Sequence, residues 1–170
     1  MLRLWHPLRD PYHCTFRLLT LLRSSPEATQ SLSMLSLLDF LWLFPYFITN
    51  VQMVKAVRQE FRHLGFPERK DSYAYLPSIK LLYRELQPLQ RTALHSMASR
   101  GFLDVDAYRN GHVILSTEKI PQELLSHLEG RIESQNQQLH FLINRIGTMD
   151  IDGSDGLLRK LNLGTGGKLR

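Results

Sequence analysis

The chain has 170 residues, the length of one domain with a single hydrophobic core. At this size folding buries about 70% of the surface that the unfolded chain exposes, so neither disulfides nor a structural metal are needed to hold the core. The single cysteine, Cys14, excludes an internal disulfide, and the first residues lack the order of a secretory signal, so we expect a reducing cytoplasm. The net charge of +5 excludes an acidic, chaperone-like surface and is compatible with polyanions or acidic protein faces as partners.

The leucine content indicates a mainly helical chain. Leucine occurs 32 times, whereas valine and isoleucine together occur 13 times, and leucine favours helices where β-branched residues favour strands. The sequence predicts a mainly α fold with one small β-hairpin: a helical N-terminal half, a winged helix-turn-helix and a long C-terminal helix. We expect residues 1–146 to form one domain and the glycine-rich residues 147–170 to form a flexible tail.

Two helices are predicted near the N-terminus. The first begins at Asp10, which is followed by a proline suited to the first turn, and it ends near Ser24. The second runs from Leu32 to Phe44 and meets a proline, which can kink or end it. Because residues 32–48 are almost wholly apolar, a membrane span is the alternative. The run has 17 residues and contains charged and proline positions, whereas a span needs about 20 apolar residues, so we predict a buried core helix and no membrane partner.

A third helix is predicted over residues 50–64, ending at Gly65, which suits a left-handed cap. Apolar side chains follow one side of this helix. Another side carries Lys55, Arg58 and Arg62 at spacings of three and four, so these cations share one face. They form either a solvated face, as most charge runs do, or a stripe that binds a polyanion.

The region from about 76 to 117 predicts a winged helix-turn-helix. Pro77 and Pro88 each open a short helix, and a glycine ends the second one. Residues 102–106 and 112–116 are two β-rich runs around a tip that ends in Asn-Gly, the pattern of a β-hairpin. This hairpin would be the wing.

Direct DNA binding is one use of such a region, since the second helix can enter the major groove while the wing touches the backbone. The candidate contact residues on the helix are Arg91, His95 and Arg100, with Gln90 as a further base reader, and Arg109 lies on the wing. Acidic residues at the base of the wing and the few cations on the helix argue against sequence-specific binding. Winged helices also dock proteins, so both uses stay open.

A long helix is predicted over residues 121–146. Its apolar residues alternate spacings of three and four, which is the heptad pattern of a helical seam, with one glutamine in it. Such a seam packs on the domain's own core or meets another chain. Its candidate contact residues are Leu125, Leu128, Ile132, Leu139, Leu142 and Ile146.

The sequence offers no convergent set of catalytic groups. His13 and Cys14 are neighbours in a helix and point in different directions, so they do not pair as base and nucleophile. No two histidines have metal-ligand spacing supported by a further ligand. Residues 164–168 resemble a phosphate-binding loop but lack its first glycine and its metal-binding hydroxyl. We therefore expect a non-enzyme without catalytic residues, cofactor or metal.

Three stretches of the sequence carry a family resemblance: residues 6–19, residues 37–45, and residues 86–94 together with Gly101 and the hairpin. In these stretches the chain resembles the middle component of bacterial ABC-three-component systems, which are relatives of the Lamassu anti-phage and anti-plasmid operons. The resemblance covers about residues 5–146, and its motifs are hydrophobic signatures rather than catalytic ones.

The resemblance implies a non-enzymatic adaptor that assembles with an SMC- or Rad50-like ABC ATPase and with an effector, often a nuclease. Such a subunit would dock near the ATPase heads, help to hold the effector inactive and transmit recognition of foreign DNA through the assembled complex. The residues by themselves also allow a winged-helix transcriptional regulator, and an enzyme is the third alternative.

Overall fold

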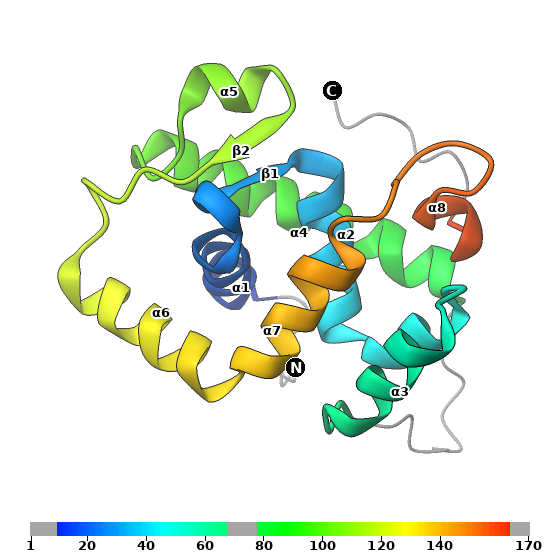
Figure 1. Cartoon of the computed structure of the whole chain (residues 1–170). Coiled ribbons are helices and arrows are strands. Elements are labelled where there is room, and N and C mark those ends of the chain that lie inside the picture. Colours follow the sequence, from blue (N-terminus) through cyan, green and yellow to red (C-terminus); the bar gives the residue numbers. More distant parts are fainter. Residues whose placement is uncertain (1–9, 68–77, 164–170) are drawn as a thin grey trace, which may run out of the picture.

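The computed structural model describes residues 10–67 and 78–163 as a helical body with one small sheet (Figure 1). The strands β1 (Thr29–Ser31) and β2 (His112–Ile114) pair antiparallel. The short turns are the 3-10 helices η2 (Pro26–Ala28) and η3 (Pro45–Asn50) and the π-helical η4 (Leu142–Ile146). The α-helices are α1 (Pro11–Ser24), α2 (Leu32–Leu43), α3 (Lys55–His63), α4 (Ile79–Ser99), α5 (Val105–Arg109), α6 (Gln122–Ser134), α7 (Asn136–Phe141) and α8 (Leu157–Lys160). The prediction of a mainly α fold with a small β element is confirmed.

The two N-terminal helices begin where the sequence predicts. The Asp10 carboxylate accepts a hydrogen bond from the Tyr12 backbone N–H at 2.8 Å, and the Ser31 hydroxyl accepts one from the Met34 N–H at 3.2 Å. Each bond satisfies an N–H group that the first turn of a helix leaves without a partner.

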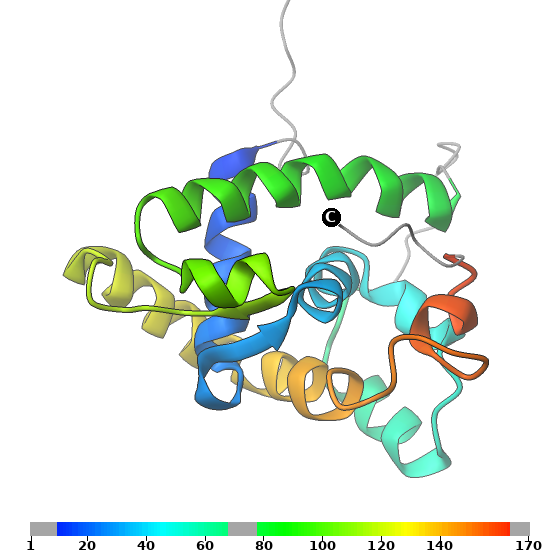
Figure 2. The ribbon, with the colours of Figure 1, turned by 90° about the horizontal axis from the view of Figure 1, so that it is seen from above.

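Helix α2 is the centre of the core. It packs against α1, α4 and η4, and Figure 2 shows it between α4 on one side and α7 on the other. All residues from Met34 to Leu41 are buried, which confirms the predicted core helix. In the described part of the chain, no helix is long and apolar enough to cross a membrane.

The predicted helix over residues 50–64 is wrong in its first part. The 3-10 turn η3 precedes it, residues 51–54 are not helical, and α3 starts at Lys55. Tertiary packing overrides the helical pattern here, because the non-helical segment places Val51 and Met53 in the core while Val54 stays 71% exposed. Gly65 has φ +63°, so the predicted left-handed position after α3 is confirmed.

The two short helices predicted around Pro88 are one helix, α4, with Pro88 inside it. Pro88 and Arg84, whose carbonyl loses its donor to the proline ring, both lie on the exposed side of α4, where water can hydrogen-bond that carbonyl. The other side buries Tyr83, Leu86 and Leu94 against α1 and α2. Core packing thus holds the helix together through its proline.

The predicted hairpin forms at its base and differs at its tip. Leu103 bridges Leu115, and the Ser116 N–H donates to the Phe102 carbonyl at 2.8 Å. The tip is the helix α5, because the Asp104 carboxylate accepts the Ala107 N–H at 2.8 Å and caps a helical turn.

Strand β2 also pairs with β1, a partner that the sequence analysis did not predict. The chain order of α1, β1, α2, α4 and two antiparallel segments is consistent with a winged helix. In a winged helix of this kind, α1 and α2 are the helices that precede α4. The sequence had predicted the short helix after Pro77 in that role.

The long helix predicted over residues 121–146 is interrupted at Gln135, which has the non-helical angles φ −124° and ψ 22° between α6 and α7. Its seam faces the domain itself: Leu128, Leu139, Leu142 and Ile146 are buried, and Leu125 and Ile132 are partly buried against the same core. Of the two predicted alternatives for the seam, packing on the domain's own core is confirmed.

The core extends past the boundary predicted at Ile146. Leu157, Leu158, Leu161 and Leu163 are 8% exposed or less and belong to the core cluster, so residues 157–163 pack on the domain, where the sequence predicted a tail. The glycine content had indicated a flexible segment, but the leucines among these glycines are buried and pack on the core. Residues 164–170 lie outside the described part of the chain.

Replacing Leu161 by alanine tests whether this C-terminal segment stabilises the fold. Leu161→Ala removes a side chain that is 1% exposed, and we expect the free energy of unfolding to fall by about 2–5 kcal/mol. Arg159→Ala, on the exposed side of α8, is the control and should change it by less than about 0.5 kcal/mol. Urea unfolding followed by circular dichroism measures the free energy of unfolding of both variants. Equal values would contradict the burial of Leu161 in the core.

Candidate functional site

A buried polar cluster joins α1, α2 and α4. Arg17 Nε donates to Asp39 Oδ1 at 2.6 Å, and its terminal nitrogen donates to Oδ2 at 3.3 Å. Gln90 Nε2 donates to Asp39 Oδ2 at 2.8 Å and to the Ser36 carbonyl at 3.0 Å. Gln90 is 1% exposed, so the prediction that it reads a base edge is wrong. Its amide instead holds the helices together.

The ion pair explains why a charged residue is stable in the core. Burial by itself lowers the pKa of Arg17, but the adjacent Asp39 carboxylate outweighs this effect and the pKa is raised overall. Arg17 therefore stays charged, and the Asp39 carboxylate has both a counter-charge and hydrogen-bond donors. A buried charge needs this pairing to avoid a large desolvation penalty.

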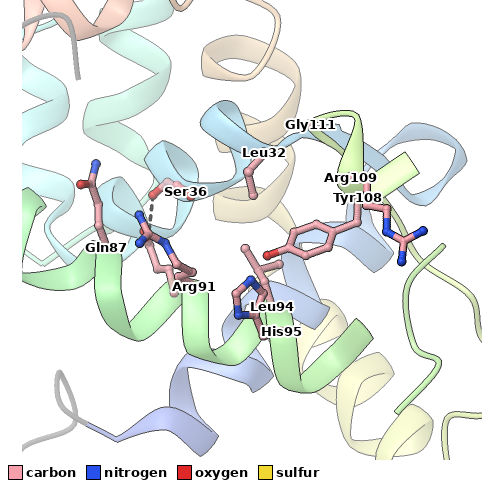
Figure 3. Close-up of a pocket in the computed structure, with 10 residues that line it drawn as sticks. Leu32, Ser36, Gln87, Arg91, Leu94, His95, Tyr108, Arg109 and Gly111 are labelled. Atoms are coloured by element: carbon pink, nitrogen blue, oxygen red, sulfur yellow. Dashed lines mark hydrogen bonds between the residues drawn. The ribbon is translucent and has the colours of Figure 1, made fainter. Parts of the chain in front are cut away.

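A pocket of about 190 Å³ lies above this cluster, between α2, α4 and α5. Figure 3 shows side chains from the three helices converging on it. Leu32 and Leu94 supply apolar walls, and Tyr108 of α5 reaches across toward α4. The other lining residues are Ser36, Gln87, Gln90, Arg91, His95, Arg109 and Gly111.

The rim of the pocket is cationic. Arg91 and His95 are exposed on α4, and Arg109 comes from α5. Arg109 lies 3.5 Å from Asp106, but both side chains are at least 75% exposed, and such a pair contributes little. Within residues 10–67 and 78–163, no carboxylate forms an ion pair with Arg91. The rim can therefore accept an anion.

Tyr108 links the rim to the interior. Its ring lies edge-on to the His95 ring, with centroids 5.8 Å apart. Partial burial raises the pKa of Tyr108, and the positive charge of Arg91 acts in the opposite direction. The phenol is therefore a neutral hydrogen-bonding group at physiological pH.

Two residues that line the pocket each have a buried polar atom without a hydrogen-bond partner among the described residues: Ser36 Oγ and Gln90 Oε1. Most buried polar atoms in folded proteins are paired, so an unpaired one calls for an explanation. A hydroxyl can donate or accept, whereas an amide oxygen only accepts. The pocket thus combines apolar walls and arginines at its rim, and two of its lining residues have an unpaired buried oxygen.

The structure brings together three of the predicted contact residues and separates the others. Arg91, His95 and Arg109 meet at the pocket. Arg100 lines a different hollow, of about 600 Å³, between α1 and α4. The predicted stripe of Lys55, Arg58 and Arg62 is exposed along α3, which lies away from α5 in both Figure 1 and Figure 2.

The hydrogen bond between Gln90 and Asp39 was not predicted, although the sequence marks both residues as polar positions among apolar ones. Asp39 interrupts an apolar run, and Gln90 falls on the buried stripe of α4, between Leu86 and Leu94 at spacings of four. Polar residues on apolar stripes indicate buried polar contacts. Their pairing depends on how α2 and α4 pack, which no local pattern gives.

The remaining candidate chemistry concerns Cys14 and metals. Cys14 is fully buried, and burial followed by the charge of Asp39 raises the pKa of its thiol to about 12, with Arg17 offsetting part of the effect. A protonated buried thiol is a poor nucleophile. The described residues contain no group of three His, Cys, Asp or Glu side chains placed to hold a metal ion.

The sequence matches a family model over residues 3–165, nearly its whole length, and this model describes the ABC-three-component system Middle Component 5. The chain belongs to this family. The match confirms the predicted middle component of an ABC-three-component system, without assigning it to Lamassu-type systems. No curated protein and no solved structure matched the chain.

Asp39→Asn tests the buried cluster. This change keeps the side-chain shape but leaves Arg17, whose side chain is 11% exposed, without its counter-charge. We expect the free energy of unfolding to fall by about 3–5 kcal/mol. Glu129→Gln breaks the Arg23–Glu129 pair, whose side chains are 42% and 53% exposed, and should cost less than about 1 kcal/mol. Denaturant titration measures the free energy of unfolding of both variants. An equal decrease in the two would contradict a special role for Asp39.

Proposed function

We propose that this chain is a non-catalytic adaptor of an ABC-three-component defence complex. It bridges an SMC- or Rad50-like ABC ATPase and an effector such as a nuclease, and it helps to control activation of that effector on foreign DNA. The observation that carries the proposal is the Middle Component 5 match over residues 3–165. The resemblance to Lamassu-type systems in the N-terminal and α4 motifs supports the choice of partners.

Two well-separated surface features support simultaneous contact with two partners. Tyr12 is 80% exposed beside the hollow between α1 and α4, and a large aromatic side chain next to a hollow is a typical anchor at protein interfaces. Helix α3 presents its three cations on another part of the surface, where they suit an acidic partner or DNA phosphates. An adaptor needs such separate surfaces.

A second candidate function is direct DNA binding as a winged-helix regulator. It is favoured by one observation, the meeting of Arg91, His95 and Arg109 from α4 and α5 beside the small sheet. Against it stands the burial of Gln90, which leaves fewer side chains on α4 to read bases. We therefore rank the adaptor first.

Co-expression with the two companion proteins of the system tests the adaptor. Tagged chain should recover both companions as one complex in size-exclusion chromatography. Tyr12→Glu places a charge at the hollow between α1 and α4 and should weaken recovery of one companion at least tenfold, while exposed Lys80→Glu on α4 should leave both. A chain that elutes alone when all three proteins are produced together would refute the proposal.

Charge reversal on α3 tests whether the stripe touches DNA in the assembled complex. Lys55→Glu, Arg58→Glu and Arg62→Glu together should weaken DNA retention by tenfold or more. The slope of log affinity against log salt should also fall by about 0.9 for each phosphate that the variant complex does not neutralise.

The control for this reversal carries the same change in net charge. It combines Lys80→Glu, Arg84→Glu and Arg159→Glu, all of which are exposed and outside α3. Retention should then stay near that of the unmodified complex. Equal retention by the α3 variant would remove the stripe from the DNA interface.

A further inference from the structure

We propose that the pocket between α2, α4 and α5 binds one nucleotide, with the base inside and the phosphate at one arginine of the rim, Arg91 or Arg109. This inference goes beyond the adaptor role, because it assigns a small ligand to residues of this chain. Four properties of the described residues support it: size, wall chemistry, unpaired buried oxygens and rim charge.

The size of the pocket fits a single ring system. Its volume of about 190 Å³ lies below the ~300–1,000 Å³ of pockets that hold drug-sized ligands. An extended peptide or a dinucleotide would remain mostly outside. A single base with its sugar at the mouth fills the space.

The walls suit a flat aromatic group. Leu32 and Leu94 cover apolar faces, and the rings of His95 and Tyr108 stand edge to face beside the opening (Figure 3). Bases bind proteins by stacking on aromatic or histidine rings, whatever their sequence. His95 is exposed, so its ring is accessible to a base that enters from solvent.

The unpaired oxygens distinguish a base from an acidic side chain. Gln90 Oε1 needs a hydrogen-bond donor, and Ser36 Oγ can both donate and accept. Every nucleobase carries N–H donors and ring or carbonyl acceptors on its edge, whereas a carboxylate carries no donor. Both oxygens are buried, so a base reaches them only when side chains move, which is a common response to binding.

The rim supplies the charge for a phosphate. Arg91 and Arg109 line the opening from two different helices and lie at opposite ends of it, on either side of Tyr108 (Figure 3). Each guanidinium can bind a phosphate through paired hydrogen bonds. Arg109 has a weak, exposed contact with Asp106, which a phosphate can displace. A base in the pocket therefore has a cationic site next to it for its own phosphate.

Two sources can present this chemistry: a free nucleotide, or an unpaired nucleotide at the end of a nucleic acid. Isothermal titration of the full chain with AMP, GMP, CMP and UMP tests the shared chemistry, with ribose 5-phosphate as the ligand that lacks a base. At least one nucleoside monophosphate should bind ten times more tightly than ribose 5-phosphate. Titration with duplex DNA carrying one unpaired terminal nucleotide, compared with the blunt duplex, identifies the source.

The matched variants remove two arginines each. Arg91→Ala with Arg109→Ala should weaken nucleotide binding at least tenfold, whereas Arg58→Ala with Arg62→Ala on α3 should leave it unchanged. All four side chains are exposed, so folding should be preserved, and thermal unfolding checks this. Recovery of the companion proteins by the Arg91 and Arg109 variant separates this inference from the adaptor proposal.

Three results would overturn the inference. One is equal binding of ribose 5-phosphate and the nucleotides, which would leave an anion site without a base. Another is the absence of binding by either nucleotide source at millimolar concentration. The third is displacement of a bound nucleotide by an acidic hexapeptide at equal concentration, which would identify the pocket as a docking site for an acidic partner.

Discussion

The ion pair between Arg17 and Asp39, completed by Gln90, is the constraint on which the arrangement of the helices depends. It links α1, α2 and α4 at a point where α2 is otherwise surrounded by leucine and phenylalanine side chains. Apolar packing is non-directional and tolerates small slips of one helix along another. A buried carboxylate that needs specific donors does not tolerate them, because an unpaired charge in the core costs several kcal/mol.

The same cluster positions the candidate site. Gln90 Nε2 donates two hydrogen bonds, one to Asp39 and one to the Ser36 carbonyl, and Gln90 Oε1 is left unpaired. Arg91, the next residue along α4, then projects to the rim. The small sheet holds α5 over the opening, because β2 pairs with β1 directly before α2. A structural cluster and a candidate binding surface therefore share one helix turn.

The described surface explains how a small chain in an ABC-three-component system could serve several contacts. The hollow beside Tyr12, the cations of α3 and the pocket at α5 lie on different elements. The heptad seam, in contrast, is used within the chain, where Leu128, Leu139 and Ile146 pack on the core. The surfaces available to partners are thus the polar and aromatic ones rather than the apolar heptad seam.

Local patterns determined the helical class, the starts of α1 and α2, the burial of α2 and the exposed cations of α3. These features follow from caps and periodicity, which act within a few residues. Tertiary packing decided the continuity of α4 through Pro88, the break at Gln135, the burial of the C-terminal leucines and the pairing of β2 with β1. It also brought Arg91 and Arg109 to one pocket and turned Gln90 inward. The physical reason is that burial energy is shared among distant residues, so it can override a proline or a glycine that acts only on its neighbours.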